Sequence, residues 1–272
     1  MISVRQTTGP DGLIGASTGD LRDKFLVQDL FVEGEFRGTY LADDRIVVAG
    51  VVPGDHDIEP SGLDVLGTDL LLERRELGVV NLAEPGDVIV DGTPYRLGPL
   101  DGLYVGRGSK VSFRGKGARF YLVSATAHET HPTVLIARDS VAPVSIVDEL
   151  GAGGRTLYRY VWGGGHGSCQ LQFGVTVLDL KSVWNTLPPH RHSRRTEVYL
   201  YTGLGPDHRV VHLLGEPNNT RHLIVAEEEV VIAPSWSLHM GAGTAPYSFV
   251  WAMAGENTDY TDLEPVKISD LR

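Results

Sequence analysis

The sequence is poor in several features that would assign it to common classes of protein. It has one cysteine, Cys169, which excludes a disulfide within the chain and favours a reducing compartment. It has no apolar run of about 18 residues, the length that a membrane-spanning helix needs, and no apolar segment of the secretory kind near its start. The sequence therefore indicates neither secretion nor a membrane partner.

Positive charge is also scarce. The chain has 24 lysines and arginines against 35 aspartates and glutamates, which gives a formal net charge of −11 at pH 7. A nucleic-acid-binding protein usually presents a basic face, so this balance argues against nucleic acid as a partner. An anionic substrate would need a local basic pocket that acts against the overall field of the protein.

Stretches with helical periodicity are few, whereas glycine is abundant at 33 residues. Short segments rich in β-branched and aromatic residues alternate with turn-forming residues, which predicts strands joined by tight turns. One short helix is expected to open near Thr18. The clearest hairpin signal is Asp91-Gly92, between the apolar residues 88–90 and a return strand. The predicted strands include 31–40, 45–52, 118–124, 155–162, 169–180, 209–214, 220–226 and 247–253. Within residues 103–113, a tight turn at 106–110 is expected between two strands.

This strand pattern runs through both halves of the chain and predicts an all-β protein built from barrels or jelly rolls. We place a domain boundary near residue 150, so that residues 1–150 form one domain and residues 151–272 the other. A strand, a tight turn and an aromatic-rich strand recur in both halves, at 103–123 and at 231–251. We interpret this echo as a duplication in which only the second copy carries a metal motif.

Four consecutive charges, Glu73-Arg74-Arg75-Glu76, lie between apolar runs. Charged residues are usually exposed, so solvated charges at a strand end or in a loop are one interpretation. An ion-pair cluster at a subunit interface or at the rim of a site is the other, and the sequence leaves both open.

The stretch with the most distinctive chemistry begins at His190-Arg-His192. Residues two apart on a strand point to the same side, so these two imidazoles can bind one metal ion. Glu197 lies at an odd offset from His192, so a turn or bulge through residues 193–196 is needed to bring its carboxylate to the same site. His239 is the fourth candidate, and three imidazoles with one carboxylate suit a divalent transition metal.

The remaining histidines and the cysteine receive structural interpretations. Cys169 has no base near it in the sequence and is expected to be a packed thiol rather than a nucleophile. His212 and His222 are not counted as ligands, because the set of four is already complete. Three histidines fall in predicted loops and are expected to be ordinary loop side chains: His128, His131 and His166.

The two-part motif, His190-x-His192-x4-Glu197 and then Pro234-x4-His239, resembles the metal motif of the cupin superfamily. That superfamily usually has a glycine where this chain has Trp236, so the turn there is expected to differ. Longer stretches read together resemble the family of 4-deoxy-L-threo-5-hexosulose-uronate ketol-isomerases, and the similarity covers nearly the whole chain in order. These stretches are residues 72–81, 103–108, 184–188, 194–199, 234–239, 249–251 and 255–257.

The resemblance implies a bicupin, with two cupin-type barrels and a metal site in the C-terminal barrel alone. It implies one zinc ion per subunit, with manganese, iron or nickel as alternatives, and a homohexamer in the cytoplasm. It also implies the conversion of 5-dehydro-4-deoxy-D-glucuronate, a small anionic sugar acid, to 3-deoxy-D-glycero-2,5-hexodiulosonate in pectin breakdown. The ligands that carry over are His190, His192, Glu197 and His239.

The implied reaction moves a carbonyl from C1 to C2 of an open-chain sugar acid. A metal that holds both oxygens would stabilise the charge that develops on an enediolate. A base must carry the proton from C2 to C1, and Glu197 is the first candidate, ahead of Tyr199, His222 and Glu229. The substrate carboxylate needs a basic partner, for which the candidates are Arg194, Arg195, Arg221 and Lys181.

Several other functions stay open at this level. An isomerase of the same superfamily acting on another uronate, such as 5-deoxyglucuronate, would use the same chemistry. A dioxygenase is a second alternative, because three histidines and a glutamate also suit iron or nickel. A closed, structural metal site in a non-catalytic sugar-binding cupin is the third.

Overall fold

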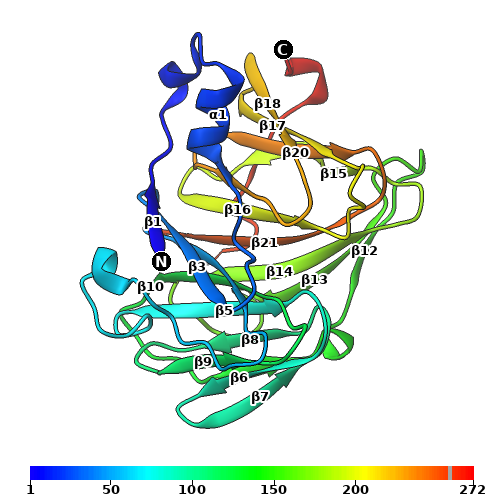
Figure 1. Ribbon diagram of the computed structural model, residues 1–272. Coiled ribbons are helices and arrows are strands. Elements are labelled where there is room, and N and C mark those ends of the chain that lie inside the picture. Colours follow the sequence, from blue (N-terminus) through cyan, green and yellow to red (C-terminus); the bar gives the residue numbers. More distant parts are fainter. Residues whose placement is uncertain (257–258) are drawn as a thin grey trace. The chain divides into compact units, whose positions relative to one another are not determined.

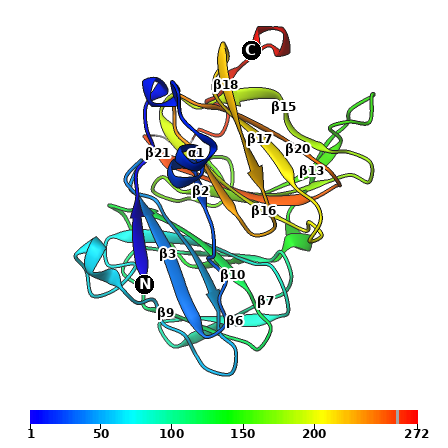
Figure 2. The same ribbon diagram turned by 45° about the horizontal axis from the view of Figure 1, so that its top comes forward.

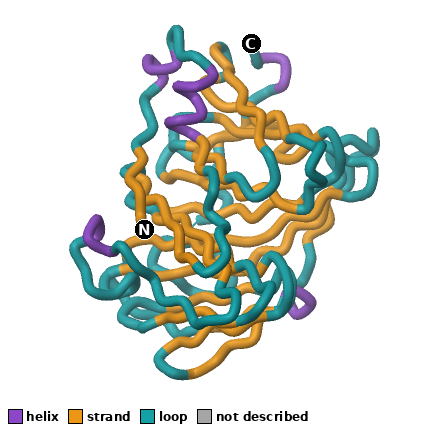
Figure 3. Tube along the Cα trace, viewed as in Figure 1, coloured by secondary structure: helices purple, strands orange, loops and turns teal. Residues whose placement is uncertain are grey.

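The computed structural model describes residues 1–256 and 259–272, and strands make up most of it (Figures 1 and 3). The prediction of an all-β protein is confirmed. Asn257, the last residue of the stretches that carry the family resemblance, lies outside the described residues. No helix in the described ranges is long and apolar enough to cross a membrane.

The chain divides into two compact units, and each is assembled from three segments rather than from one half of the sequence. The second unit takes in an early segment of the chain, and the first takes in a short segment after residue 159. The first unit is Met1–Arg5, Asp29–Ala142 and Tyr160–Phe173, and the second unit is Gln6–Gln28, Pro143–Arg159 and Gly174–Arg272.

The first unit contains a seven-stranded and a three-stranded sheet that share one apolar core. Two 3-10 helices, η2 (Leu63–Leu66) and η3 (Arg138–Ser140), accompany them. In order across the large sheet, the strands are β1 (Ile2–Arg5), β3 (Glu35–Leu41), β4 (Val47–Val52), β10 (Phe120–Thr126), β5 (Arg75–Asn81), β8 (Gly102–Val105) and β11 (Val134–Ile136). Those of the small sheet are β7 (Thr93–Leu97), β6 (Gly86–Val90) and β9 (Val111–Arg114).

The predicted hairpin of this unit is confirmed. Strands β6 and β7 pair antiparallel from Gly86–Leu97 to Val90–Thr93. The two turn residues between them, Asp91 and Gly92, have φ of 49° and 83°, as a two-residue hairpin turn of this hand requires. The apolar face of the hairpin enters the core through Val88, which is fully buried.

The second unit also contains two sheets, one of seven and one of five strands. The seven-stranded sheet has the order β12 (Val144–Ile146), β13 (Arg155–Val161), β14 (Gln172–Leu178), β21 (Ser248–Gly255), β16 (Arg195–Thr202), β19 (Val230–Ala233) and β2 (Leu26–Val27). The five-stranded sheet has the order β18 (Asn219–Val225), β17 (Val210–Glu216), β20 (Leu238–Gly243), β15 (Trp184–Arg191) and β22 (Glu264–Pro265). The helices are η1 (Pro10–Leu13), α1 (Thr18–Phe25) and η4 (Ile268–Asp270).

Helix α1 begins at Thr18, as predicted. The Ser17 side chain accepts a hydrogen bond from the Asp20 backbone, and the Asp20 carboxylate accepts one from the Ser17 backbone, which forms a capping box. The helix lies beside β18 (Figure 2), where the Arg22 guanidinium donates to the Ile224 carbonyl at 2.9 Å. Its buried side chains, among them Phe25, complete the core of the second unit.

The two large sheets share an internal order that supports the predicted duplication. Five central strands run β3-β4-β10-β5-β8 in the first unit and β13-β14-β21-β16-β19 in the second. In both, the last strand in the chain lies at the centre, between the second and the third. Strand β5 is therefore the counterpart of β16, the strand that carries Glu197.

The charged run at residues 73–76 does not behave as one group. Arg74 is exposed and pairs with Glu73 at 3.4 Å, which fits the interpretation of solvated charges. That interpretation is wrong for Arg75 and Glu76, which are 5% and 0% exposed in β5. Arg75 donates to the side chain and the carbonyl of Ser124, on the neighbouring strand β10.

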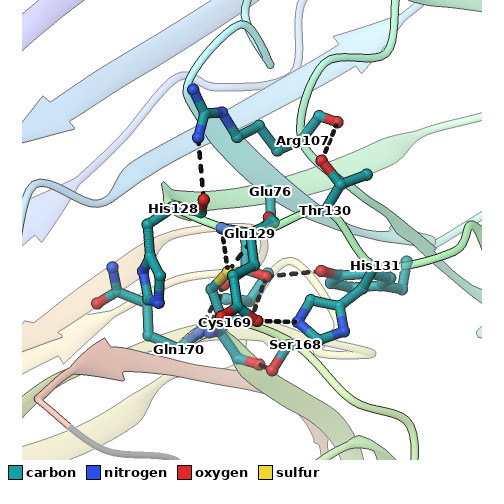
Figure 4. A network of polar contacts seen from close by, with 11 residues as sticks. Glu76, Arg107, His128, Glu129, Thr130, His131, Ser168, Cys169 and Gln170 are labelled. Atoms are coloured by element: carbon teal, nitrogen blue, oxygen red, sulfur yellow. Dashed lines mark hydrogen bonds and ion pairs between the residues drawn. The ribbon is translucent and has the colours of Figure 1, made fainter.

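Glu76 fixes a loop of the first unit through its carboxylate (Figure 4). Oε1 accepts from the backbone N–H groups of Gln170 and Leu171, both at 2.8 Å. Oε2 accepts from the Cys169 N–H at 2.8 Å and from the Tyr104 hydroxyl at 2.6 Å. Each oxygen thus has two donors, so the buried carboxylate is fully satisfied.

We predict that Glu76→Gln destabilises the protein by about 3 kcal/mol or more, because a buried donor left without an acceptor costs more than a hydrogen bond contributes. Whichever way the amide is turned, its NH2 group would face at least one backbone N–H, which cannot accept a hydrogen bond. The measurement is urea unfolding, with Glu73→Gln as the control at a half-exposed carboxylate. A Glu76→Gln protein as stable as the control would contradict this role.

Candidate metal centre

Both sheets of the second unit contribute to the predicted metal site. His190 lies in β15 and His239 in β20, and the two residues are directly opposite each other in the five-stranded sheet. Glu197 lies in β16 of the seven-stranded sheet. His192 follows the end of β15, and a turn at residues 193–194 then carries the chain across to β16. This is the turn that the offset between His192 and Glu197 predicts.

The four side chains converge tightly. One ligand atom from each lies within 4.8 Å of all the others. Glu197 Oε2 is 3.0 Å from His192 Nε2 and 3.3 Å from His239 Nε2, and the Nε2 atoms of His190 and His239 are 3.2 Å apart. Glu197, His192 and His239 are at most 3% exposed.

Two buried polar atoms at the centre of this cluster lack hydrogen-bond partners. His192 Nε2 and Glu197 Oε2 are close, yet neither has a partner with hydrogen-bond geometry in the described part of the chain. Orphaned buried atoms of this kind are rare, and a shared metal ion is one thing that satisfies them. The donor set, three imidazole nitrogens and a carboxylate oxygen, also fits a divalent transition metal.

The protonation states favour binding of a cation. Burial, together with the adjacent rings of His239 and His192, holds the pKa of His190 well below its usual value, so this ring is neutral. Burial pushes the pKa of Glu197 up, but the adjoining His192 and His239 outweigh it and hold that pKa well below its usual range. The cluster therefore offers a carboxylate and a neutral imidazole, the forms that bind a metal.

A second layer of contacts orients His192. Its Nδ1 lies 2.8 Å from the Asp262 carbonyl oxygen, so Nδ1 carries the proton and Nε2 directs its lone pair into the cluster. The Arg195 guanidinium donates to the same carbonyl at 3.0 Å. Arg195 is 1% exposed, so its side chain belongs to the wall behind the cluster.

A buried polar group that includes His212 lies in the same unit. The hydroxyl of Tyr201 is 2.7 Å from His212 Nδ1 and accepts from the Asn185 amide at 3.3 Å. Burial lowers the pKa of His212 to about 3, so the ring is neutral. His212 is outside the set of four residues that could hold a metal, in agreement with its exclusion as a ligand.

The cluster opens on a pocket of about 280 Å³. His190, His192 and Glu197 form part of its wall, and much of the rest is apolar, with Leu157 and Trp251 among the residues. This volume is close to the lower end, about 300 Å³, of the range usual for small-molecule sites. Tyr199, Tyr260 and Arg155 supply polar groups to the same wall.

None of the four basic residues predicted to bind the substrate carboxylate is among the residues that line the described pocket. Arg194 is exposed and pairs with Asp262 at 3.2 Å, and Arg195 is buried behind His192. Arg221 donates to Asn219 and to the Leu13 carbonyl, and Lys181 is exposed. None of the four is brought to the pocket among the residues that the structure describes.

Two of the four candidate bases line the described pocket and two do not. Glu197 and Tyr199 line the pocket. His222 is exposed on β18, and the Glu229 carboxylate accepts hydrogen bonds from Gln28 and from the Ala226 backbone. Burial, reinforced by the charge of Glu197, raises the pKa of Tyr199 well above its usual value, so this hydroxyl keeps its proton.

Sequence reasoning missed Arg155. The strand 155–162 was predicted, and residues 155 and 157 lie on one side of it. The alternation of side chains along the strand places Arg155 and Leu157 on one face. It does not show which face of the strand is directed towards the metal site.

Comparison with known proteins gives a consistent result. The model of the KduI/IolB family matches residues 67–265. A protein of Kineococcus radiotolerans named 4-deoxy-L-threo-5-hexosulose-uronate ketol-isomerase is 47% identical, over 98% of this chain and 99% of its own length. A Bacillus subtilis protein of the same name is 42% identical over the same shares. The crystal structure of an IolB-like protein from Salmonella typhimurium superposes with a TM-score of 0.73 at 14% identity, covering 89% of this chain and 97% of that one, and shows a shared fold.

We predict that His239→Ala abolishes tight metal binding, because it removes one of four donors and the site relies on all of them. Adding zinc to the metal-free wild type should raise the thermal midpoint, since a ligand that binds only the folded state stabilises it. The variant should show no such rise. His222→Ala is the control, an exposed histidine outside the cluster, and equal zinc responses in the two variants would contradict the assignment.

We predict a pH dependence of stability that originates at His212. Its pKa is about 3 in the folded protein and about 6.5 when unfolded, so its contribution is complete above about pH 6.5 and is lost as the pH falls towards 3. Between about pH 7 and pH 5, the metal-free wild type should lose about 2 kcal/mol more than His212→Gln does. Urea unfolding at both pH values checks this, and identical losses would contradict it.

Proposed function

Because the chain belongs to the KduI/IolB family, we propose that it is a metal-dependent ketol-isomerase that converts 5-dehydro-4-deoxy-D-glucuronate to 3-deoxy-D-glycero-2,5-hexodiulosonate. The observation that carries the proposal is the buried three-histidine, one-glutamate cluster in the wall of a pocket suited to a small molecule. Relatives named 4-deoxy-L-threo-5-hexosulose-uronate ketol-isomerase match 98–100% of the chain at 40–47% identity. The proposed biological setting is pectin and uronate breakdown.

The metal is proposed to be zinc, one ion per subunit, held by His190, His192, Glu197 and His239. When bound, it would act as a Lewis acid towards the carbonyl and hydroxyl oxygens of the sugar. The orphaned atoms His192 Nε2 and Glu197 Oε2 support these residues as ligands. Manganese, iron and nickel accept similar donors, so metal analysis of the purified protein must accompany every assay.

The chain's own residues would handle the proton. A proton must move from C2 to C1, and Glu197 is the proposed carrier because it is the only carboxylate among the described residues of the pocket wall. Tyr199 lies beside it and keeps its proton, so it can donate a hydrogen bond to a sugar oxygen as charge develops there. The apolar wall excludes water from these groups and accepts a deoxygenated carbon of the substrate without an unpaired hydroxyl.

The remaining parts of the proposal rest on the family resemblance. They are a homohexamer, a cytoplasmic setting and a bicupin. The domains at 1–150 and 151–272, inferred from the strand pattern, stay a prediction beside the two units of the fold. The group of residues that could hold a metal lies in the second unit among the residues described, which supports a single site in the C-terminal barrel. The small anionic sugar acid is the one partner that the proposed reaction requires.

We predict that the metal-loaded wild type isomerises 5-dehydro-4-deoxy-D-glucuronate and that activity follows metal content across preparations. His190→Ala should lower kcat/KM by about a thousandfold or more, because a buried ligand is lost together with the Lewis acid that it holds. The assay couples product formation to metal analysis of each sample.

Three outcomes would redirect the assignment. Wild type that binds one metal ion but leaves this substrate unchanged would contradict the substrate assignment, and turnover of 5-deoxyglucuronate would then identify the alternative isomerase. Oxygen uptake with bound iron would indicate a dioxygenase. Sugar binding without turnover of any uronate would indicate a non-catalytic cupin.

A further inference from the structure

Arg155 occupies a distinctive position in the second unit. It is the first residue of β13 and is half-buried. It lines the pocket that contains His190, His192 and Glu197, and it is the one lysine or arginine in the described wall. It also lines a neighbouring, more open cavity together with Leu187 and Pro188. Arg155 therefore stands where the inner pocket meets the outer one.

The guanidinium of Arg155 is poorly satisfied by its own chain. It donates to the Gly153 carbonyl at 2.7 Å, and no carboxylate in the described residues pairs with it within 4.0 Å. Asp148, which acts on Arg155 only through its charge, accepts backbone N–H groups from Leu150, Ala152 and Gly153. Of the five N–H donors of a guanidinium, most are left for a ligand.

Two other arginines of the second unit, in contrast to Arg155, form ion pairs with carboxylates. Arg191 lies 2.7 Å from Glu264, and Arg194 lies 3.2 Å from Asp262. The Arg194 pair is exposed, where such contacts contribute little, and the Arg191 pair is partly buried. Arg155 is half-buried and has no such partner, so the cost of removing part of its charge from water is not recovered by an ion pair within the described chain.

We propose that Arg155 binds the carboxylate of the substrate and makes the site selective for sugar acids over neutral sugars. This rests on the proposed isomerase function, which it deepens by naming the residue that recognises the acid group. A guanidinium pairs with a carboxylate through two parallel N–H···O hydrogen bonds. The pocket wall otherwise carries the negative charge of Glu197, within a protein of net charge −11, so this cation is the local attraction that an anionic ligand needs.

The placement also sets the direction of the substrate. The metal-ligand cluster lies in the inner pocket, and Arg155 lies where that pocket meets the outer cavity. A six-carbon acid held by Arg155 at its carboxylate would direct its other end, C1 and C2, towards the cluster. Binding energy at the non-reacting end would then position the reacting end, which affects kcat as well as KM.

The test uses metal-loaded wild type, Arg155→Met and Arg155→Lys, with Arg209→Met as the control. Arg209 is exposed and donates hydrogen bonds to the carbonyls of Pro206 and His208. Arg209→Met removes one positive charge, as Arg155→Met does. Calorimetry measures the affinity for D-glucuronate and for its neutral counterpart, D-glucuronamide. The isomerase assay on 5-dehydro-4-deoxy-D-glucuronate is run in parallel, and metal content is measured for every protein.

We expect wild type and Arg209→Met to prefer D-glucuronate by about tenfold or more, and Arg155→Met to lose that preference at unchanged metal content. Its kcat/KM should fall roughly 30- to 300-fold. Arg155→Lys keeps the charge without the paired donors, so its preference should lie between those of wild type and Arg155→Met. This second variant also decides the question if Arg155→Met does not fold.

The proposal is overturned if Arg155→Met keeps the preference, if wild type has none, or if wild type binds neither probe. Failure of the isomerase function would look different. Wild type would then leave 5-dehydro-4-deoxy-D-glucuronate unchanged while still discriminating the two probes through Arg155. Turnover by wild type with an unaffected Arg155→Met would retain the function and discard the role of Arg155.

Discussion

The second unit depends on how it accommodates the buried charge of Glu197. A carboxylate that is 3% exposed between two sheets costs several kcal/mol unless its oxygens are paired. The chain places two imidazole nitrogens within 3.3 Å of Oε2, yet that atom has no hydrogen bond in the described chain. These contacts therefore leave Oε2 unpaired, and the position that would pair it is the point on which His190, His192 and His239 also converge.

The counterpart strand in the first unit shows the opposite solution. Glu76 lies in β5, which has the same place in its sheet as β16, and it too is fully enclosed. Its oxygens accept four hydrogen bonds, three of them from consecutive backbone N–H groups. A satisfied carboxylate anchors a loop, whereas an unsatisfied one that faces three imidazoles attracts a cation. After a duplication, the groups that surround one carboxylate therefore decide whether its strand holds a loop in place or contributes a ligand to a metal site.

Much of the site could be predicted from the sequence because its signals are local. His190 and His192 are separated by one residue, and the odd offset of Glu197 requires the turn that the structure has at residues 193–194. Burial is not local, which is why other features escaped prediction. The sequence gives no reason to prefer Arg155 over Arg194 for a place in the pocket, and base rates for charged residues suggest an exposed Glu76. Residues 6–28 belong to the second unit and residues 160–173 to the first. Both assignments depend on contacts between residues that are far apart in the chain.

The arrangement of the ligands also links the metal to the stability of the unit. His190 and His239 belong to the five-stranded sheet and Glu197 to the seven-stranded sheet, so an ion bound by all of them would join the two sheets across the core. Without it, three imidazoles lie with ring centroids 4.6–5.4 Å apart around one carboxylate, and burial together with the two adjacent rings holds the pKa of His190 well below its usual value. The four donor groups are therefore already gathered at one point before an ion arrives. Folding of the unit holds the donor groups together before the ion is present. Binding of the ion would then stabilise the folded state.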